Sequence, residues 1–581
     1  MEILNKKDFI SALKLGKFKC FAGVLMRVIS LRKLNKAYAR AYSENGLDFI
    51  QKAFKEFGFT HKVDEKELEN IPKEGAFITV SNHPFGGIDG LMLIKTMAER
   101  RADFKIMANF LLERIAPIKD YLLIVNPFEE LKEKKSSFQG IKHAIQHLNN
   151  NAPIGIFPAG EVSTYHNGSV EPIDKAWQST IMRIIMQAKV PVVPVFFAGT
   201  NSKTFHLLGK IHPRLRTVYL IRELFNKKGQ TLHMRIGKPI SVKELESFEN
   251  RQDLSAFLRA KTYSLGASLT RNNGRISPNM PRKKAKKIPE AISKEVLTQE
   301  IDQLPKECLV QHEGKFSLYI TPHNHIPNVL YELGRIREIT FRQAGEGTNK
   351  KVDIDKYDRY YHQLFIWDNQ AHRLVGGYRI GIGKEIMDCY GIEGFYINSL
   401  FKIDKAFYPY LEKSIELGRS FIVKEYQKSP LPLLLLWRGI WSYLDSNPSY
   451  LYMIGPVSIS NKMSSFSKSM LVQYIQTYYF DNELAQYINA RNSFEPNFGT
   501  VNPDIVLEKV GDNLNLFDKY IEEVEASKMK LPVLLKKYLK QNAKILGFNI
   551  DPKFNNALDG LLFLVYNDMP KSMIMRLKKD L

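Results

Sequence analysis

The stretch that decides the fold of the N-terminal half reads AFITVSNHPFGGIDG and occupies residues 76–90. Its first five residues are apolar or β-branched, which is typical of a buried strand. Two glycines follow at Gly86 and Gly87, and an apolar helical pattern begins near Gly90. The stretch therefore predicts a strand–turn–helix unit of an α/β domain, with His83 and Asp89 in the turn at the carboxyl end of the strand.

Further apolar runs extend this pattern along the chain. We expect strands at 122–125, 154–157, 190–197 and 232–236, and helices between them, as at 90–100 and 138–148. Strands that alternate with helices indicate one α/β domain, to which we assign residues 46–261. Residues 262–300 lose this periodicity and contain the basic run 282–287, so they are predicted to form a linker.

Residues 1–45 precede this domain, and 8–42 have an amphipathic helical pattern with many lysines and arginines. Such a helix fits a membrane interface. The alternative interpretation is a helix whose apolar face packs on its own domain.

A different pattern begins after the linker. The sequence predicts strands at 315–320, 395–400 and 450–458, helices at 328–342 and 432–444, and a hairpin over 363–380. We assign residues 301–482 to a second α/β or α+β domain and 483–581 to a helical C-terminal extension. No turn motif of the first domain recurs in the second, so the chain is predicted to join two unrelated cores.

The composition restricts the possible classes of protein. The 581 residues carry a net charge of +23 and are 44% apolar and 25% charged, which is typical of a packed globular chain. Three dispersed cysteines, Cys20, Cys308 and Cys389, and the lack of an evident secretory signal predict a reducing cytoplasm. No apolar run reaches the roughly 20 residues of a membrane span, so we expect a peripheral protein on the inner face of the cytoplasmic membrane. The positive surplus favours anionic lipid or an acidic protein over nucleic acid, because no aromatic and basic reading motif accompanies it.

The first chemical motif is the pair of His83 and Asp89. A carboxylate that fixes one imidazole nitrogen lets the other nitrogen take a proton from a substrate hydroxyl. This pair would then catalyse acyl transfer without a nucleophile from the protein. The alternative interpretation is a structural histidine that is capped by an aspartate.

Three further blocks follow His83 and Asp89 in order, at 155–163, 190–195 and 235–240. Together the four blocks resemble the lysophospholipid acyltransferase superfamily over about residues 70–245. The resemblance implies a mixed sheet with helices, a catalytic pair formed by His83 and Asp89, and a substrate site formed by Asn82, Gly86, Gly87, Pro158, Gly160, Glu161 and Pro194.

Two departures from the family pattern bear on the acceptor. Five residues separate His83 from Asp89 instead of four, and Ala159 replaces the glutamate of a block whose arginine is also missing. In the family this glutamate and arginine hold the acceptor's phosphate. The longer turn with Gly86 and Gly87 resembles the branch that O-acylates amino-acid lipids, whose acceptor is a hydroxyl on an acyl chain.

The second motif is a set of charged residues between 331 and 460. Arg379 and Arg419 fall within or beside predicted strands, where a charge is costly unless it is paired. The expected partners are Asp355, Asp358 and Glu416. The alternative interpretation is an ion-pair network that only orders the domain.

The spacing of this set resembles the N-acyltransferases that make ornithine and related amino-acid lipids, whose relatives include haemolysin-like proteins, and more distantly the acyl-homoserine-lactone synthases. Both are GNAT-type folds with mixed sheets. The resemblance implies that an amino acid's α-amine attacks a 3-hydroxyacyl thioester, and that Arg379 or Arg419 binds the amino acid's carboxylate. The base stays open among Asp355, Asp358, Glu416 and His362, of which we select Glu416. The implied substrate site comprises Arg337, Phe341, Arg342, Asp355, Asp358, His362, Arg379 and Arg419.

The prediction of the acyl donor depends on the position of a glycine motif. Residues 342–347 match the glycine motif with which GNAT enzymes bind coenzyme A, but that loop should follow the strand near 421–427. This favours an acyl carrier protein, which is acidic, as donor over coenzyme A. We expect no cofactor and no metal, because His143 and His147 lack an intervening glutamate and His323 and His325 lack further ligands.

The two halves together predict a bifunctional aminolipid synthase that first N-acylates an amino acid and then O-acylates the 3-hydroxyl. One alternative is a lysophospholipid acyltransferase whose second domain recruits the carrier protein. The other is a non-catalytic, haemolysin-like membrane-binding protein.

Overall fold

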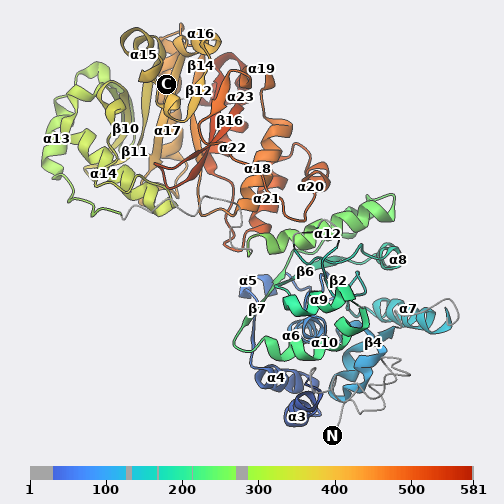
Figure 1. Ribbon diagram of the computed structural model, residues 1–581. Coiled ribbons are helices and arrows are strands. Elements are labelled where there is room, and N and C mark those ends of the chain that lie inside the picture. The colour runs from blue at the N-terminus through green and yellow to red at the C-terminus, as the bar shows by residue number, and fades with distance from the viewer. Residues whose placement is uncertain are drawn as a thin grey trace. The chain divides into compact units, whose positions relative to one another are not determined.

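The computed structural model describes residues 30–125, 134–166, 169, 171–211, 213–269 and 285–578, and the chain forms two compact units (Figure 1). Unit 1 comprises Met1–Arg271, Gly499–Gly511 and Glu523–Lys528, and unit 2 comprises Asn272–Phe498, Asp512–Glu522 and Met529–Leu581. Two short segments near the C-terminus therefore belong to the N-terminal unit. This division differs from the five consecutive domains that we predicted from the sequence.

Unit 1 is built on a seven-stranded sheet in the order β1-β7-β6-β2-β5-β3-β4. The strands from β4 to β6 run parallel, and β7 is antiparallel to β6, so the sheet is mixed as expected. The strands are β1(Thr60–Lys62), β2(Ile78–Ser81), β3(Lys105–Asn109), β4(Leu122–Val125), β5(Ile154–Ile156), β6(Val192–Ala198) and β7(Thr231–Ile236).

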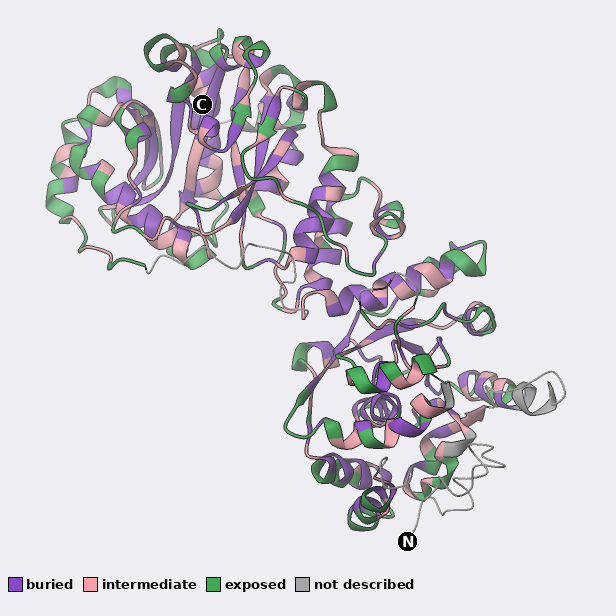
Figure 2. Ribbon diagram, viewed as in Figure 1, coloured by how far each residue is buried: buried purple, intermediate pink, exposed green. Residues whose placement is uncertain are grey.

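Helices cover both faces of this sheet. One core cluster joins it to α3, α4 and α6, and a second cluster joins its other face to α7, α8 and α12. Figure 2 shows the buried residues of the strands between these layers. The helices are α3(Leu31–Ala41), α4(Gly46–Phe57), α5(Glu65–Leu68), α6(Gly87–Ala98), α7(Lys134–Asn149), α8(Ser179–Ala188), α9(Lys203–Ile211), α10(Pro213–Asn226), α11(Val242–Glu246), α12(Arg251–Ala267) and α20(Pro503–Val510).

The predicted strands of unit 1 are all present, whereas β1 and β3 were missed because both are short and contain a lysine. The predicted helix 8–42 lies partly outside the described residues. Its described part, α3, buries Leu31, Leu34 and Tyr38 in the core of unit 1. This part of the amphipathic segment therefore packs on its own unit. The predicted linker is also shorter than expected, since α12 continues to Ala267 and α13 begins at Lys294.

Unit 2 is built on an eight-stranded sheet in the order β16-β17-β14-β13-β11-β10-β9-β8. All neighbours are antiparallel except β13 and β14, so this sheet is also mixed. Its strands are β8(Leu309–Glu313), β9(Phe316–Thr321), β10(His362–Asp368), β11(Arg373–Ile382), β13(Ser414–Ile422), β14(Tyr452–Ile459), β16(Lys544–Asp551) and β17(Ala557–Val565), and β12(Phe401–Ile403) pairs separately with β15(Ile488–Ala490).

Helices α14 and α17 pack against the central strands of this sheet: α14 contacts β13, and α17 contacts β9, β10 and β11. The helices are α13(Lys294–Asp302), α14(Pro327–Ala344), α15(Gly383–Tyr390), α16(Tyr408–Glu412), α17(Leu431–Ser446), α18(Ser465–Tyr478), α19(Asn482–Ala485), α21(Leu514–Val524), α22(Val533–Leu539) and α23(Lys571–Lys578). None of the helices in the described part of either unit has the length and apolar character needed to cross a bilayer.

Two predictions for unit 2 are wrong. Residues 395–400 form mainly the 3₁₀ turn Tyr396–Ser399 instead of a strand. The tail 483–581 is not a helical extension, because β16 and β17 complete the sheet beside β14. Both faces of β17 are buried, so its sequence ALDGLLFLV has apolar residues at successive positions and no clear alternation of apolar and polar residues.

Candidate active sites

The turn after β2 holds the first pair of predicted residues. His83 lies between the end of β2 at Ser81 and the start of α6 at Gly87. Gly86 adopts a φ of 82°, a backbone conformation that favours glycine. In this turn Nδ1 of His83 lies 3.0 Å from Oδ2 of Asp89, so the structure brings the predicted pair together.

The carboxylate of Asp89 is completely buried and is held by backbone donors. Oδ2 accepts hydrogen bonds from the N–H groups of Phe85 and Gly86, at 2.9 and 3.0 Å. Burial raises the pKa of Asp89, while His83 and these two N–H groups act in the opposite direction. Because Asp89 fixes Nδ1, the other ring nitrogen of His83, Nε2, faces away from it.

A second aspartate fixes the backbone of His83. Oδ1 of Asp174 accepts hydrogen bonds from the His83 N–H at 3.1 Å and from the Ser163 hydroxyl at 2.6 Å. The His83 ring packs on Phe157, with 4.3 Å between ring centroids, and the side chain stays 19% exposed. Sequence reasoning missed Asp174, since a single aspartate in a loop has no recognisable spacing.

The predicted block after β5 lies at the same sheet edge as His83. The backbone N–H of Ser163 donates to the His83 carbonyl at 2.9 Å. Gly160 has a φ of 70°, and a Cβ there would lie 2.1 Å from Nε2 of Gln178, so the position requires glycine. Pro158 is buried beside it.

Glu161 in this block pairs with an arginine that lies outside the block. Arg216 of α10 donates from Nη2 to Oε2 of Glu161 at 2.9 Å. The sequence did not indicate this pair, because the two residues come from different elements that only the fold brings together.

Three predicted substrate residues have different surroundings. Both polar atoms of the Asn82 amide bond to the backbone of Phe197, at 2.7 and 2.9 Å, so Asn82 joins β2 to β6. Pro194 is buried within β6 opposite Val80, and it too belongs to the sheet. Gly87 begins α6, with no atom within 4 Å of the position that a Cβ would take.

A buried lysine lies beneath this turn. Nζ of Lys227 lies 4.6 Å from the centre of the Phe85 ring and donates to the Thr200 carbonyl at 2.8 Å. Burial lowers the pKa of Lys227, whereas Glu223 and Asp89 raise it. The negative charge of Asp89 therefore has a buried cation in its surroundings, which no sequence motif indicated.

In unit 2 Arg379 and Arg419 pair with carboxylates as predicted, but Glu416, the third predicted partner, pairs with neither arginine. Nη1 of Arg379 donates to Asp355 at 2.7 Å and to Asp358 at 3.2 Å. Arg337 donates to Asp358 at 2.9 Å, and Arg419 lies 2.8 Å from Asp353 and 3.4 Å from Asp355.

This network balances three arginines with three aspartates, as burial of charge requires. Burial raises the pKa of Asp358, but Arg379 and Arg337 outweigh it and hold the pKa well below its usual range. Arg337 and Arg379 are each 1% exposed, so they compensate the charge of the aspartates in the interior of the unit.

Glu416, the predicted base, is buried among donors. It accepts hydrogen bonds from the Tyr361 hydroxyl and from the N–H groups of Tyr396, at 3.1 Å, and Ile397, at 2.8 Å. Burial raises its pKa to about 7, although these donors oppose the shift. Glu416 does not line the cavity described next, so its contacts hold the 396–397 turn in place.

A cavity of unit 2 lies where β13 and β14 separate. Their parallel pairing covers only Ser414–Glu416 and Tyr452–Ile454. Beyond it β13 bulges, because Arg419 and Ser420 together stand opposite Tyr378 of β11, and Arg419 has a φ of 52°. The cavity measures about 750 Å³ and is lined by 417–422 of β13 and 456–458 of β14.

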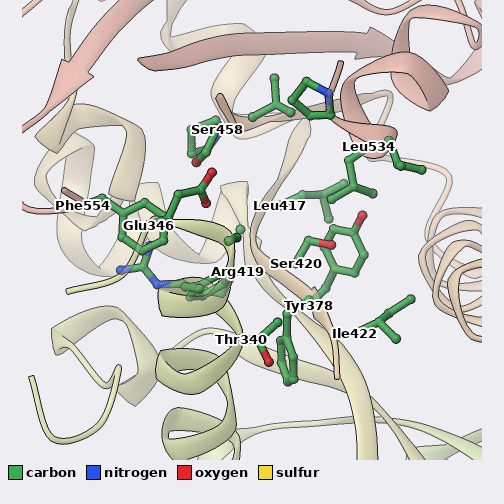
Figure 3. A pocket seen from close by; sticks show the side chains of 18 of the residues that line it. Thr340, Glu346, Tyr378, Leu417, Arg419, Ser420, Ile422, Ser458, Leu534 and Phe554 are labelled. Atoms are coloured by element: carbon green, nitrogen blue, oxygen red, sulfur yellow. The ribbon is translucent and has the colours of Figure 1, made fainter. Parts of the chain in front are cut away.

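The two ends of this cavity differ in character (Figure 3). Glu346, Arg419 and Ser458 lie at one end, with Phe554 beside them. Leu417, Tyr378, Ile422 and Leu534 lie towards the other. The C-terminal segment supplies Leu534, Phe554 and Asp559, which shows why this segment is part of the domain.

Two carboxylates at the polar end are unlike those of the network. Burial raises the pKa of Glu346 to about 7, and Lys462 opposes the shift. Burial, together with Asp551, raises the pKa of Asp559 to about 8. Neither was predicted as a site residue, since Asp559 lies in a strand with no motif.

The remaining predicted residues are placed as follows. Phe341 lines the cavity and packs on Phe421 and Phe554. Arg342 pairs with Glu338 at 2.7 Å, and its glycine motif is explained by the end of α14, where Gly345 has a φ of 89°. His362 lies at the start of β10, outside the cavity lining, with its pKa lowered by burial.

The histidines that the sequence set aside have ordinary surroundings. Nε2 of His147 lies 2.8 Å from the Asp103 carbonyl, and His143 is exposed on α7. His323 and His325 form a 3₁₀ turn before α14. The described residues contain no group of three or more candidate metal ligands.

Comparison with known proteins gives two family matches. Residues 9–272 match the model of a family described as acyltransferase, and residues 336–437 match that of an acetyltransferase (GNAT) domain. A solved structure, that of the 1-acyl-sn-glycerophosphate (LPA) acyltransferase PlsC from Thermotoga maritima, aligns with 45% of this chain and 98% of its own, at 20% identity and a TM-score of 0.27.

Curated relatives fall into two kinds. The glycine N(alpha)-acyltransferase of Phocaeicola vulgatus is 30% identical over 275 residues, covering 45% of this chain and 77% of the relative, and that of Bacteroides thetaiotaomicron is 33% identical over 34% of this chain and 61% of the relative. The lyso-glycine lipid O-acyltransferase of B. thetaiotaomicron is 28% identical over 42% of this chain and 90% of the relative. This pairing fits bifunctional aminolipid synthesis. The chain belongs to the glycine N(alpha)-acyltransferase family and is an acyl-transferring enzyme with an N-terminal acyltransferase domain and a C-terminal GNAT-type domain.

Proposed function

We propose that the chain makes a two-chain amino-acid lipid in two steps. Unit 2 transfers a 3-hydroxyacyl group from a thioester to the α-amino group of glycine, and unit 1 transfers a second acyl group to the 3-hydroxyl. The observation that carries the proposal is the 3.0 Å contact of His83 with Asp89 in unit 1, in a chain whose unit 2 has its own cavity. The names of the two kinds of relative describe the same two steps.

In the O-acylation step, His83 is the general base. Nε2 takes the proton of the 3-hydroxyl as its oxygen attacks the thioester carbonyl, and the C–S bond then breaks. The imidazolium returns the proton to the departing thiolate. Asp89 stabilises the imidazolium and fixes the ring, while Asp174 holds the backbone of His83.

The surroundings of Glu161 support a hydroxyl acceptor on an acyl chain over a glycerol phosphate. A phosphate would be bound by a free arginine fork. Arg216, the arginine that reaches this loop, already donates to Glu161. Gly160 and Pro158 line the same edge, where the lyso-lipid is expected to lie.

In the N-acylation step, the two ends of the unit 2 cavity take the two parts of the substrates. The acyl chain lies along the apolar end, against Leu417, Tyr378 and Leu534. The amino acid lies at the polar end, which Arg419 lines while its guanidinium bonds to Asp353, Asp355 and Tyr396. The bulge at Arg419 and Ser420 turns backbone groups towards the cavity, where N–H donors would stabilise the oxyanion. Arg379 is assigned to the supporting network instead.

An acyl carrier protein is the proposed donor, because an acidic carrier complements a chain of net charge +23. Arg342, an arginine of the glycine motif, already donates hydrogen bonds to Glu338 and to backbone carbonyls. That leaves no evident phosphate site at the motif for coenzyme A among the described residues.

The proposed location is peripheral, on an anionic membrane surface. Leu207 and Ile211 of α9 are 60% and 68% exposed, and Tyr165 is 40% exposed. Lys203 and Lys210 are exposed on the same helix. Since α9 follows the carboxyl end of β6, this apolar and basic surface belongs to the sheet edge that carries His83, where a lipid acceptor would enter.

A lipid profile tests the function. The intact chain and its His83→Ala variant are expressed in a host that lacks aminolipids, and lipids are analysed by mass spectrometry. We expect two-chain glycine lipids from the intact chain and N-acylglycine with one chain from the variant. Consumption of lysophosphatidic acid without a new aminolipid would identify a lysophospholipid acyltransferase instead. No change in either pool, with expression and donor supply verified, would favour the non-catalytic membrane-binding alternative.

A further inference from the structure

Glu346 is an acid that lines the polar end of the unit 2 cavity. It follows α14 at a helix end where its N–H donates to the Phe341 carbonyl at 2.8 Å. The preceding carbonyl, that of Gly345, accepts from Asn555 at 2.7 Å. These bonds fix the backbone on both sides, and the carboxylate projects into the cavity beside Phe554 (Figure 3).

The partners of the acids separate Glu346 from the rest. Asp353, Asp355 and Asp358 pair with arginines, and Glu416 accepts from three donors. No hydrogen bond to the Glu346 carboxylate is found among the residues that the structure describes. The nearest cation, Lys462, donates from Nζ to the Gln343 carbonyl at 2.7 Å.

Asp559 lies close enough to Glu346 that the charge of Glu346 contributes to the raised pKa of Asp559. Its Oδ1 accepts the Ser458 hydroxyl at 2.8 Å. The other charged groups near this pair are Arg419, Asp551 and Lys462. The carboxylate of Glu346, which has no hydrogen-bond donor among the described residues, suits a substrate ammonium group.

We propose that Glu346 is the general base of N-acylation. This inference rests on the proposed function of unit 2. Glycine enters as the ammonium form at the polar end of the cavity, where its amino group meets the carboxylate of Glu346.

The chemical step balances as follows. Glu346 accepts one proton from the ammonium group, and the freed amine forms the N–C bond at the thioester carbonyl. The C–S bond breaks, and the thiolate leaves. The second proton lost by the nitrogen passes to this thiolate, and Glu346 releases its own proton to solvent. The raised pKa of Glu346, about 7, matches a base that works near neutral pH.

The test is the Glu346→Gln variant of the full chain, assayed for N-acylation of glycine between pH 5.5 and 9. The variant is expected to lose about 100-fold in kcat/KM and to lack the rise in rate near pH 7. Glu412→Gln, on the exposed end of α16, is the matched control and is expected to retain the wild-type profile. A loss under about threefold with an unchanged profile would overturn the assignment.

A second variant separates folding from chemistry. Glu346→Asp keeps a carboxylate at this position and is expected to retain the rise in rate near pH 7, with a smaller loss in kcat/KM than Glu346→Gln. A Glu346→Asp variant without this rise would contradict the assignment of Glu346 as the base. If the wild-type chain itself forms no N-acylglycine, the proposed function has failed, whereas an active wild type with an active Glu346→Gln variant contradicts this inference alone.

Discussion

The two sites differ in how the chain builds them. The site of unit 1 is local, because His83 and Asp89 are six residues apart and meet in one turn. The cavity of unit 2 collects Glu346, Arg419, Ser458, Leu534 and Phe554 from separate elements. A local site leaves a sequence motif, whereas an assembled site leaves only scattered polar residues. The predictions below use this difference, since a change in one unit should leave the chemistry of the other intact.

The largest effect is expected from Asp89→Asn. The amide oxygen can still accept from the N–H groups of Phe85 and Gly86, but it no longer fixes and stabilises the His83 ring. O-acylation is expected to fall by roughly 10²–10⁴-fold in kcat, with little change in KM. The measurement is steady-state kinetics with a purified lyso-lipid.

N-acylation of glycine by the same Asp89→Asn preparation serves as the internal control and should stay within about twofold of wild type. A parallel loss of both activities would show that the two sites are not independent.

Arg379→Met tests the buried network of unit 2. It leaves Asp355 and Asp358 with less compensation, which for a buried ion pair costs about 3–5 kcal/mol in free energy of unfolding. Urea unfolding followed by tryptophan fluorescence reports mainly on unit 2, because Trp367, Trp437 and Trp441 are there.

Arg359→Met, at an exposed position nearby, is the control for this change. The variant should still O-acylate an added lyso-lipid, since unit 1 is untouched. Equal stability of the two variants would contradict the structural role assigned to Arg379.

A smaller effect is expected at the exposed surface of α9. Leu207→Ser with Ile211→Ser removes apolar side chains whose burial in a membrane is worth roughly 1.5–3 kcal/mol each when complete. Because insertion is partial, binding to anionic phospholipid vesicles in a sedimentation assay should weaken about tenfold.

Leu516→Ser, at an exposed leucine of unit 2, is expected to bind these vesicles as wild type does. Unchanged binding by the α9 variant would remove this helix from the proposed membrane surface.

The smallest effect concerns pH. Asp559, Glu346 and Glu416 have pKa values raised to about 8, 7 and 7. The folded chain therefore binds more protons than the unfolded chain between the ordinary carboxyl range, near pH 4, and about pH 8. Stability falls as pH rises through this window.

Thermal unfolding followed by tryptophan fluorescence should show a Tm for unit 2 that decreases from pH 5 to pH 8, by roughly 2–4 °C for each kcal/mol. Asp559→Asn should reduce this slope. A Tm that increases over the same range would contradict the assigned ionisation.

The outcome of sequence reasoning followed the same division between local and assembled features. Apolar runs located β2, β4, β5, β6 and β7 of unit 1 and β9, β10, β11 and β14 of unit 2, because buried strands have a clear pattern. Sequence reasoning did not locate the short β1, β3 and β8, nor β13. It failed for β16 and β17, where burial on both faces removes the alternation that identifies a strand. It also chose Glu416 as base, which the structure places among three donors and outside the cavity lining.

The His83–Asp89 turn and the glycine at 86 could thus be predicted from the sequence, because these residues are close in the chain. The pairing of Arg379 with Asp355 and Asp358, which are 24 and 21 residues away, followed instead from the rule that a buried charge needs a partner. Tertiary structure decided the rest, including Asp174 beneath His83, Arg216 beside Glu161, and the placement of Glu346 in a cavity completed by β17. The physical reason is range. Hydrogen bonds within a turn follow from local spacing, whereas burial, which sets the charge and pKa of a side chain, depends on every segment that packs around it.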